Sequence, residues 1–263
     1  MTGTTVASVN ALGVTLSPSL RQTRTLVRFP RTNPDDTSEP PLTVLVDCGG
    51  AVSPLPADVR RLDHVILTHP DVLHHGAIAA TATVPVDYAH YGGDLGQYSA
   101  STRTWLRDTG AWNLPLCVDD LSRSMPYLSR GGAQLFIVSA NASGRYDSGD
   151  TDANAVVPLF VVGSHAVLLL GDAPTERAWR SVTEAAKPKG PLAGLTQLLV
   201  VGHPAARDRA APPWCPAAGV VVGTEPYGPP DPHPGVLAVT VRMPGTPPAT
   251  GASPLHLTWT TGE

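Results

Sequence analysis

The chain has 263 residues, of which 42% are hydrophobic and 15% charged, enough for one large globular domain or two small ones. Its net charge of −4 argues against a general nucleic-acid binder, which needs a basic surface, but it does not exclude a local basic groove. Three distant cysteines without a CxxC pair argue against a disulfide framework and favour a reducing compartment, and no apolar run reaches the about 18 residues of a membrane span.

The N-terminal segment supports two interpretations. No acidic residue precedes Asp35, whereas four arginines do, and this composition is typical of an organellar transit peptide. Alternating β-branched residues in 5–14 and 23–29 instead favour two opening strands. We expect an intracellular protein, cytoplasmic in the second interpretation and imported into an organelle in the first.

The first half of the chain predicts strands interrupted by short helices. Strands 23–29 and 42–50 flank a polar, Pro-rich loop, and residues 56–70 indicate a short helix followed by a buried strand at Val65–Thr68. A helix at 75–82, a strand within 83–92 and a helix near 101–108 complete this half.

The second half predicts the same kind of succession. A strand at 133–140 precedes two strands that meet at Gly163 and Ser164, a hairpin signal. Pro174 opens the clearest helix, at 175–186, and further strands are expected within 195–204, 217–226, 236–243 and 254–263. Two halves that each combine strands with a helix predict a layered α/β fold with sheets packed face to face.

Potential metal ligands follow several of these strands. His69, Asp71 and His74 come after the strand ending at Thr68, and Asp172 and His203 each come after a run of apolar residues and a glycine. Metal-dependent hydrolysis needs several ligands aimed at one point with a position left for water, and strand ends hold ligands rigidly.

The segments "LVDCGG", "ILTHPDVLHHGA", "VLLLGDA" and "VVGHP", in this order, resemble the metallo-β-lactamase superfamily across nearly the whole chain. The resemblance implies a single domain, 1–263, built as a four-layer αβ/βα sandwich. Residues 153–179 and 220–237 are similar to the nuclease-like domain of DNA-uptake (late competence) channel proteins. "THPDVLHHGA" is similar to the non-catalytic subunit of the mRNA cleavage and polyadenylation factor.

The resemblance implies a damaged metal site. His69, Asp71, His74, Asp172 and His203 match ligand positions, and Asp47 matches a residue that braces the histidine loop. Leu73 stands where the family has a metal-binding Asp, and Ser139, Ala140 and Asn141 stand where a third-strand His is expected.

Two functions therefore remain open. One is a non-catalytic structural or interaction subunit with a protein partner. The other is a mononuclear metal-dependent hydrolase, a phosphodiesterase or nuclease, that binds one zinc, manganese or iron and uses metal-bound water. The alternative roles of the residues are a hydrogen-bonded turn around His69, Asp71 and His74, a helix N-cap for Asp172 and a loop position for His203.

The remaining notable residues are assigned structural roles. We expect Cys48 in the core and His75 turned away from its neighbour His74. We expect His90 and His165 at the surface or in a hairpin.

Overall fold

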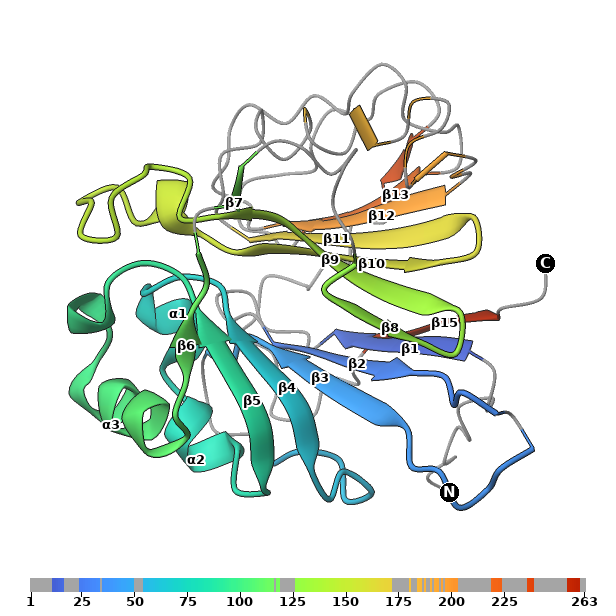
Figure 1. The fold of residues 1–263 in the computed structure, drawn as a ribbon, viewed down its shortest axis with the longest axis horizontal. Helices are drawn as coiled ribbons and strands as arrows, with labels where there is room; N and C mark the ends of the chain where they lie inside the picture. The colour runs from blue at the N-terminus through green and yellow to red at the C-terminus, as the bar shows by residue number, and fades with distance from the viewer. Residues whose placement is uncertain are drawn as a thin grey trace, which may run out of the picture.

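The computed structural model describes residues 11–16, 24–33, 35–49, 54–115, 117–118, 126–171, 197–202, 219–223, 236–238 and 255–260, with isolated positions between 180 and 195. These residues form two β-sheets and a group of helices (Figure 1). None of the helices described is long and apolar enough to cross a membrane.

The first sheet has seven strands in the order β15-β1-β2-β3-β4-β5-β6. The strands are β1 (Ala11–Leu16), β2 (Thr25–Phe29), β3 (Leu42–Val46), β4 (Leu62–Leu67), β5 (Val86–Tyr91), β6 (Trp112–Asn113) and β15 (Leu255–Thr260). Neighbours from β15 to β3 are antiparallel, and neighbours from β3 to β6 are parallel. The carboxyl ends of β3, β4 and β5 therefore meet at one edge.

The second sheet has the order β14-β13-β12-β11-β10-β9-β7, with β8 also paired to β9. The strands are β7 (Cys117–Val118), β8 (Leu128–Arg130), β9 (Ala133–Ala140), β10 (Val157–Val162), β11 (His165–Gly171), β12 (Gln197–Gly202), β13 (Gly219–Gly223) and β14 (Val236–Ala238). Neighbours from β11 to β14 are parallel and the other pairs are antiparallel. This sheet also gathers strand ends, those of β11 and β12, at one edge.

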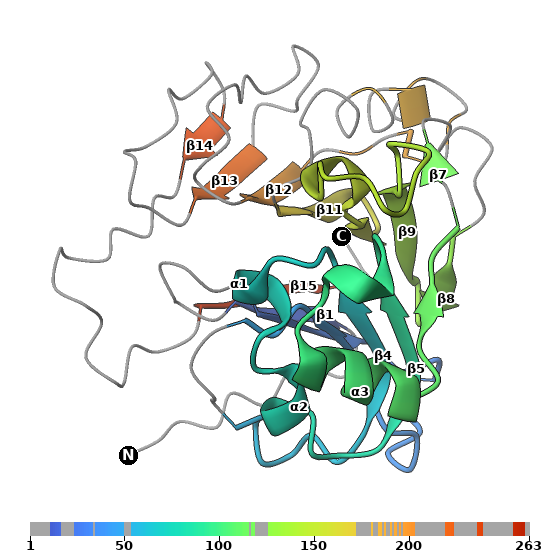
Figure 2. The same cartoon turned by 90° about the vertical axis from the view of Figure 1, so that its left-hand side faces the viewer.

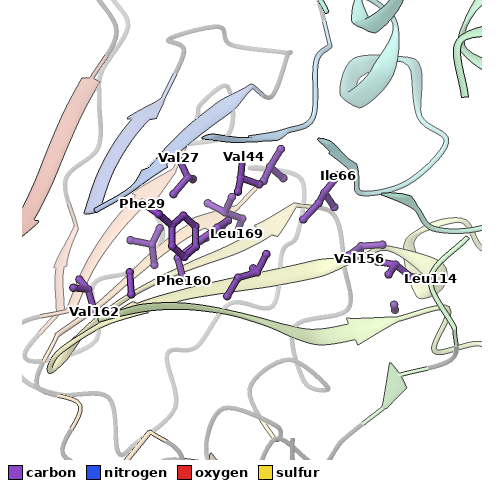
Figure 3. Packing of buried hydrophobic residues seen from close by; sticks show 14 residues of the cluster. Val27, Phe29, Val44, Ile66, Leu114, Val156, Phe160, Val162 and Leu169 are labelled. Atoms are coloured by element: carbon purple, nitrogen blue, oxygen red, sulfur yellow. The ribbon is translucent and has the colours of Figure 1, made fainter. Parts of the chain in front are cut away.

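A shared hydrophobic core joins the two sheets. Val27, Val44 and Ile66 of the first sheet belong to the same buried cluster as Phe160 of the second (Figure 3). The rings of Phe29 and Phe160 meet edge to face with centroids 6.0 Å apart. Each such buried side chain contributes on the order of 1.5–3 kcal/mol, so this interface stabilises the arrangement of the sheets.

Helices lie against the first sheet on the side away from the second (Figures 1 and 2). They are α1 (Val72–His75), α2 (Ile78–Thr81) and α3 (Ala100–Asp108), with the short 3-10 turn η1 (Leu95–Gln97). A second 3-10 turn, η2 (Asp152–Asn154), lies instead in the connection between β9 and β10 of the second sheet. Val65 and Leu67 of β4 share a second buried cluster with Ile78 and Leu106 of the helices. The second half of β4 is thus covered on both faces, which explains the apolar run Val65–Leu67.

Most strand predictions are confirmed, one helix prediction is wrong, and the helix expected at 75–82 is divided between the end of α1 and α2. β9 spans Ala133–Ala140 as expected, and β10 and β11 form the expected hairpin around Gly163 and Ser164. The short helix expected before Val65 is a turn, because β4 already begins at the fully buried Leu62 and pairs there with β5. The helix expected at 175–186 falls largely outside the described residues, of which only Arg180, Glu184 and Ala185 lie in it, all helical.

Candidate metal site

Asp47 braces the histidine loop, as predicted. It follows β3 with a left-handed backbone φ of 57°, which Asp tolerates better than most residues. Its buried carboxylate accepts hydrogen bonds from the Thr68 backbone N–H at 2.8 Å and from the Thr68 hydroxyl at 2.9 Å. His74 Nδ1 lies 2.7 Å from the same carboxylate. One side chain therefore fixes both ends of the loop that carries the motif.

This network also sets the proton positions on two histidines. A carboxylate only accepts hydrogen bonds, so His74 Nδ1 carries a proton and donates it to Asp47. The Thr68 hydroxyl donates to Asp47, so it accepts from His69 Nδ1 at 3.2 Å. In the neutral rings the lone pairs of His69 and His74 then sit on Nε2, the state in which imidazole binds metals. The two ring centroids are 4.1 Å apart.

Cys48 and Gly49 hold the histidine loop close to the end of β3. Cys48 N–H donates to the His74 carbonyl at 2.6 Å, and Ala77 N–H donates to the Cys48 carbonyl at 2.9 Å. A Cβ placed on Gly49 would lie 1.3 Å from the Leu73 carbonyl oxygen, so only glycine fits this approach. Cys48 is buried in the core, as expected.

Asp71 and Leu73 form the start of α1. Asp71 is exposed and caps the helix, because its Oδ1 accepts from the Leu73 backbone N–H at 2.8 Å. Leu73, at the position of the missing carboxylate, is half-buried and offers no ligand atom in its side chain. The side chain at position 73 therefore supplies no ligand to a metal ion.

His75 turns away from the motif, as expected. Its Nδ1 lies 2.9 Å from the Thr102 hydroxyl of α3, and its Nε2 lies 3.0 Å from the Pro70 carbonyl. Burial lowers the pKa of His75 from its ordinary value, although the bond to Pro70 opposes the shift. Its contacts are those of a structural residue that ties the loop to α3.

Asn141 occupies the region of the expected third-strand histidine. It follows β9 with a left-handed φ of 51° and is buried. Its side chain accepts from the Gly93 N–H at 2.7 Å and donates to the Leu114 carbonyl at 2.5 Å and to Asn113 at 3.0 Å. Asn141 thus connects the end of β9 to the segments after β5 and β6, and sequence reasoning had noted only the missing histidine.

The second sheet brings two further strand ends to the motif. A Cβ placed on Gly171, the last residue of β11, would lie 3.8 Å from His74 Cε1. Gly171 pairs in register with Gly202, the last residue of β12. Asp172 and His203 come next in the chain after these glycines and lie outside the described residues.

Asp152 is a neighbour of His69 that the sequence did not reveal. It belongs to η2, on the loop between β9 and β10, and its Oδ1 lies 3.9 Å from His69 Nε2. Within the described part of the chain, no group of three or more His, Cys, Asp or Glu side chains is placed to hold a metal ion. The metal role of His69, Asp71, His74, Asp172 and His203 stays a prediction.

Comparisons with known proteins find structural likenesses at low sequence identity. One is a variant of the CmlA beta-hydroxylase, with 18% identity and a TM-score of 0.41 over 72% of this chain and 35% of that chain. Another is the metallo-beta-lactamase fold protein YhfI from Bacillus subtilis, with 15% identity and a TM-score of 0.38 over 81% of this chain and 86% of that chain. The chain thus spans about a third of the CmlA chain. No protein-family model and no curated protein matches the chain.

Proposed function

We propose that this chain is a metallo-β-lactamase-fold protein with a degenerate metal site, and that it acts as a non-catalytic structural or interaction subunit with a protein partner. The sequence resemblances to the superfamily, and to the non-catalytic subunit of the mRNA cleavage and polyadenylation factor, support this choice. The proposal includes the four-layer αβ/βα arrangement, a single domain and an intracellular location.

The observation that carries the proposal is the state of the positions where the resemblance implies metal ligands. Asp71 is exposed and caps α1, so its carboxylate makes a structural hydrogen bond. Leu73 supplies no ligand, and Asn141 is committed to backbone groups of neighbouring loops. Each of these contacts stabilises the fold without a metal ion, and a two-metal hydrolytic centre lacks two of its ligands.

The test is a hydrolysis assay on metal-loaded protein. Purified protein would be loaded with zinc or manganese and assayed with bis(p-nitrophenyl) phosphate. The matched variants are His69→Ala/His74→Ala, which removes both motif imidazoles, and His165→Ala, which removes a histidine of the β10–β11 hairpin. We expect the unmodified protein and both variants to hydrolyse this substrate no faster than the metal ion does without protein. Metal-dependent turnover that survives in His165→Ala and disappears in the double variant would contradict the proposal.

A mononuclear hydrolase is the second candidate, and the proton positions in the site favour it. Asp47 orients His74 through Nδ1, which is the usual partner arrangement of a metal-binding histidine. His69, His74, Asp172 and His203 would hold one ion, which would lower the pKa of bound water and supply a nucleophile. Metal content by plasma mass spectrometry tests this: about one ion per chain, lost in the double variant, is required.

A further inference from the structure

His90 is a buried histidine of the first sheet, apart from the motif loop, and only 2% of it is exposed. Ile66 of β4 pairs in register with His90 of β5, so the half-buried His64 of β4 lies diagonally opposite His90. Nδ1 of His64 and Nε2 of His90 are 3.5 Å apart. The expectation that His90 lies at the surface was wrong, because β5 turns this side chain toward the interior.

The side chain that covers His90 comes from the second half of the chain. Tyr127 directly precedes β8, and its hydroxyl lies 3.0 Å from His90 Nε2. The Tyr127 ring meets the rings of His90 and His64 edge to face, with centroids 5.4 and 6.2 Å away. Tyr127 is 42% exposed, as is Trp112 of β6 at 65%, whose ring meets His90 edge to face. These two rings therefore lie between the buried imidazole and water.

The other end of β8 is attached to the first sheet by an ion pair. Arg130, the last residue of β8, donates to Glu39 Oε1 at 2.5 Å and to the Pro40 carbonyl at 2.6 Å. The side chains of Arg130 and Glu39 are 15% and 24% exposed, so the pair is partly shielded from water. Residues 127–130, which we call the strap, thus cross the first sheet from β5 to the β2–β3 loop, with a polar contact at each end.

Between these two contacts the strap is weakly held. In the described part of the chain β8 is a three-residue strand off the main path of the second sheet, and it pairs with β9 alone. Leu128 is partly buried against the shared core, whereas Ser129 is exposed. Gly131 and Gly132, with left-handed φ values of 56° and 80°, form the turn to β9. Local opening of so small an element costs less than global unfolding.

Acid acts on the first contact through His90. Burial, with a smaller repulsion from His64, lowers the pKa of His90 to about 4. Asp63, next to His64 on β4, favours a charge on His64, although burial is the larger effect and lowers the pKa of that ring too. A protonated His90 needs water, and it gains water when Tyr127 moves away. Because His90 is fixed on an internal strand, the strap is the part that moves.

Acid acts on the second contact through Glu39. Desolvation alone would raise the pKa of Glu39, but hydrogen bonds from Asn33, Thr32 and Arg130, together with the charge of Arg130, lower it below its ordinary value. The ion pair is therefore present at neutral pH and is lost only in acid, when Glu39 takes up a proton. The bond from Arg130 to the Pro40 carbonyl does not titrate and opposes release.

We propose that the strap is released by acid: Tyr127 on His90 and Arg130 on Glu39 hold it across the first sheet at neutral pH, and it leaves when His90 and Glu39 take up protons, while both sheets stay folded. Release uncovers His90 and the part of the shared core that Leu128 contacts. This conformational device is independent of the proposed function.

The experiment is hydrogen exchange by mass spectrometry on the full chain between pH 7.5 and 4, with rates corrected for the intrinsic effect of pH. The strap is followed by the peptide that contains Tyr127, whose N–H donates to the Leu135 carbonyl at 2.7 Å. The fully buried β10 is the internal reference. If His90 titrates near 6.5 when uncovered and near 4 when covered, opening of the strap should increase about a hundredfold by pH 4. β10 should stay protected throughout.

Two variants separate a titrating contact from a merely structural one. His90→Gln/Glu39→Gln keeps neutral polar side chains at both positions and removes both titrations. Its strap should show a much shallower pH dependence, to which His64 still contributes. His165→Ala, in the β10–β11 hairpin, is the matched control and should keep the full dependence. If the double variant does not fold, Tyr127→Phe replaces it, and loss of the hydroxyl should speed exchange of the strap at pH 7.5.

The results that would overturn the proposal are distinct from one another. A strap as protected at pH 4 as at pH 7.5 would show that acid does not release it. Loss of protection in the strap and in β10 together would show global unfolding instead of local release. An unchanged pH dependence in His90→Gln/Glu39→Gln, or unchanged exchange in Tyr127→Phe, would show that these contacts do not hold the strap.

Discussion

Replacing Asp47 should destabilise the whole protein, and the size of the effect depends on the replacement. The carboxylate is 3% exposed and accepts three hydrogen bonds, two from Thr68 and one from His74. Asp47→Ala removes both acceptor oxygens and all three hydrogen bonds, and it leaves a buried Thr68 N–H without its partner. Asp47→Asn keeps one carbonyl oxygen and the tolerance for a left-handed backbone, but it places an amide where two donors converge.

The magnitudes follow from these contacts. A hydrogen bond to a charged group contributes about 1.5–3 kcal/mol, so Asp47→Asn should lower the free energy of unfolding by about that amount. Asp47→Ala should cost about 3–6 kcal/mol, because the left-handed φ of 57° adds about 1–2 kcal/mol for a residue with a Cβ. Asp47→Gly removes the same hydrogen bonds without that strain, so it should be more stable than Asp47→Ala by about 1 kcal/mol.

The assay is equilibrium unfolding in urea, followed by the fluorescence of the five tryptophans. Asp58→Asn is the matched control, because it makes the same chemical change in an exposed pair with Arg28. Exposed ion pairs contribute at most about 1 kcal/mol, so this variant should stay close to the unmodified protein. An Asp47→Asn protein as stable as the Asp58→Asn control would refute the bracing role of Asp47.

Three further predictions concern His90, Gly49 and Asn141. Burial, with a smaller repulsion from His64, lowers the pKa of His90 to about 4, so the unfolded chain binds the extra proton first. Stability that is complete above about pH 6.5 should therefore fall by up to about 3 kcal/mol toward pH 4. Unfolding curves of a His90→Phe variant should show a shallower dependence on pH, which His64 and His75, whose pKa values burial also lowers, still contribute. Gly49→Ala should lower stability by at least about 3 kcal/mol or prevent folding, whereas Gly149→Ala, where a Cβ meets nothing within 4 Å, should not change the melting temperature. Asn141→Ala should cost about 2–4 kcal/mol in urea unfolding, since it leaves the Gly93 N–H without its acceptor, and a change below about 0.5 kcal/mol would contradict this role.

The apolar pattern predicted the strands well because burial determines it. β9 and the β10–β11 hairpin match their expected bounds, since consecutive apolar residues in these strands pack into the two clusters on either side of the second sheet. The turn before β4 was misread as a helix, because propensity over a few residues cannot show where pairing with a distant strand begins. The exposure of His90 was misjudged for a related reason. Alternation in "VDYAHY" indicates a strand but not which face meets the other sheet.

The candidate site was predictable where side chains carry charge or bind metals, and not where they bind backbone. The order of the motif segments pointed to Asp47 and to the histidines. Thr68 and Asn141 gave no comparable signal, because a hydroxyl or amide committed to loop backbone has no characteristic spacing in the sequence. Gly49 offered a signal that could have been used, since two adjacent glycines after a strand often mark a close backbone approach.

The two candidate functions assign different roles to Asp172 and His203, the residues that follow Gly171 and Gly202 in the chain. Gly171 and Gly202 end neighbouring parallel strands in register, and Gly171 lies against His74. A ligand immediately after each glycine would add a carboxylate and an imidazole to the two histidines that Asp47 and Thr68 already orient. Replacing Asp172 or His203 should therefore leave stability unchanged but abolish metal binding if the mononuclear hydrolase is correct. If Asp172 instead caps the following helix, Asp172→Asn should retain most stability and Asp172→Ala should lose about 1 kcal/mol, with metal content unaffected by either.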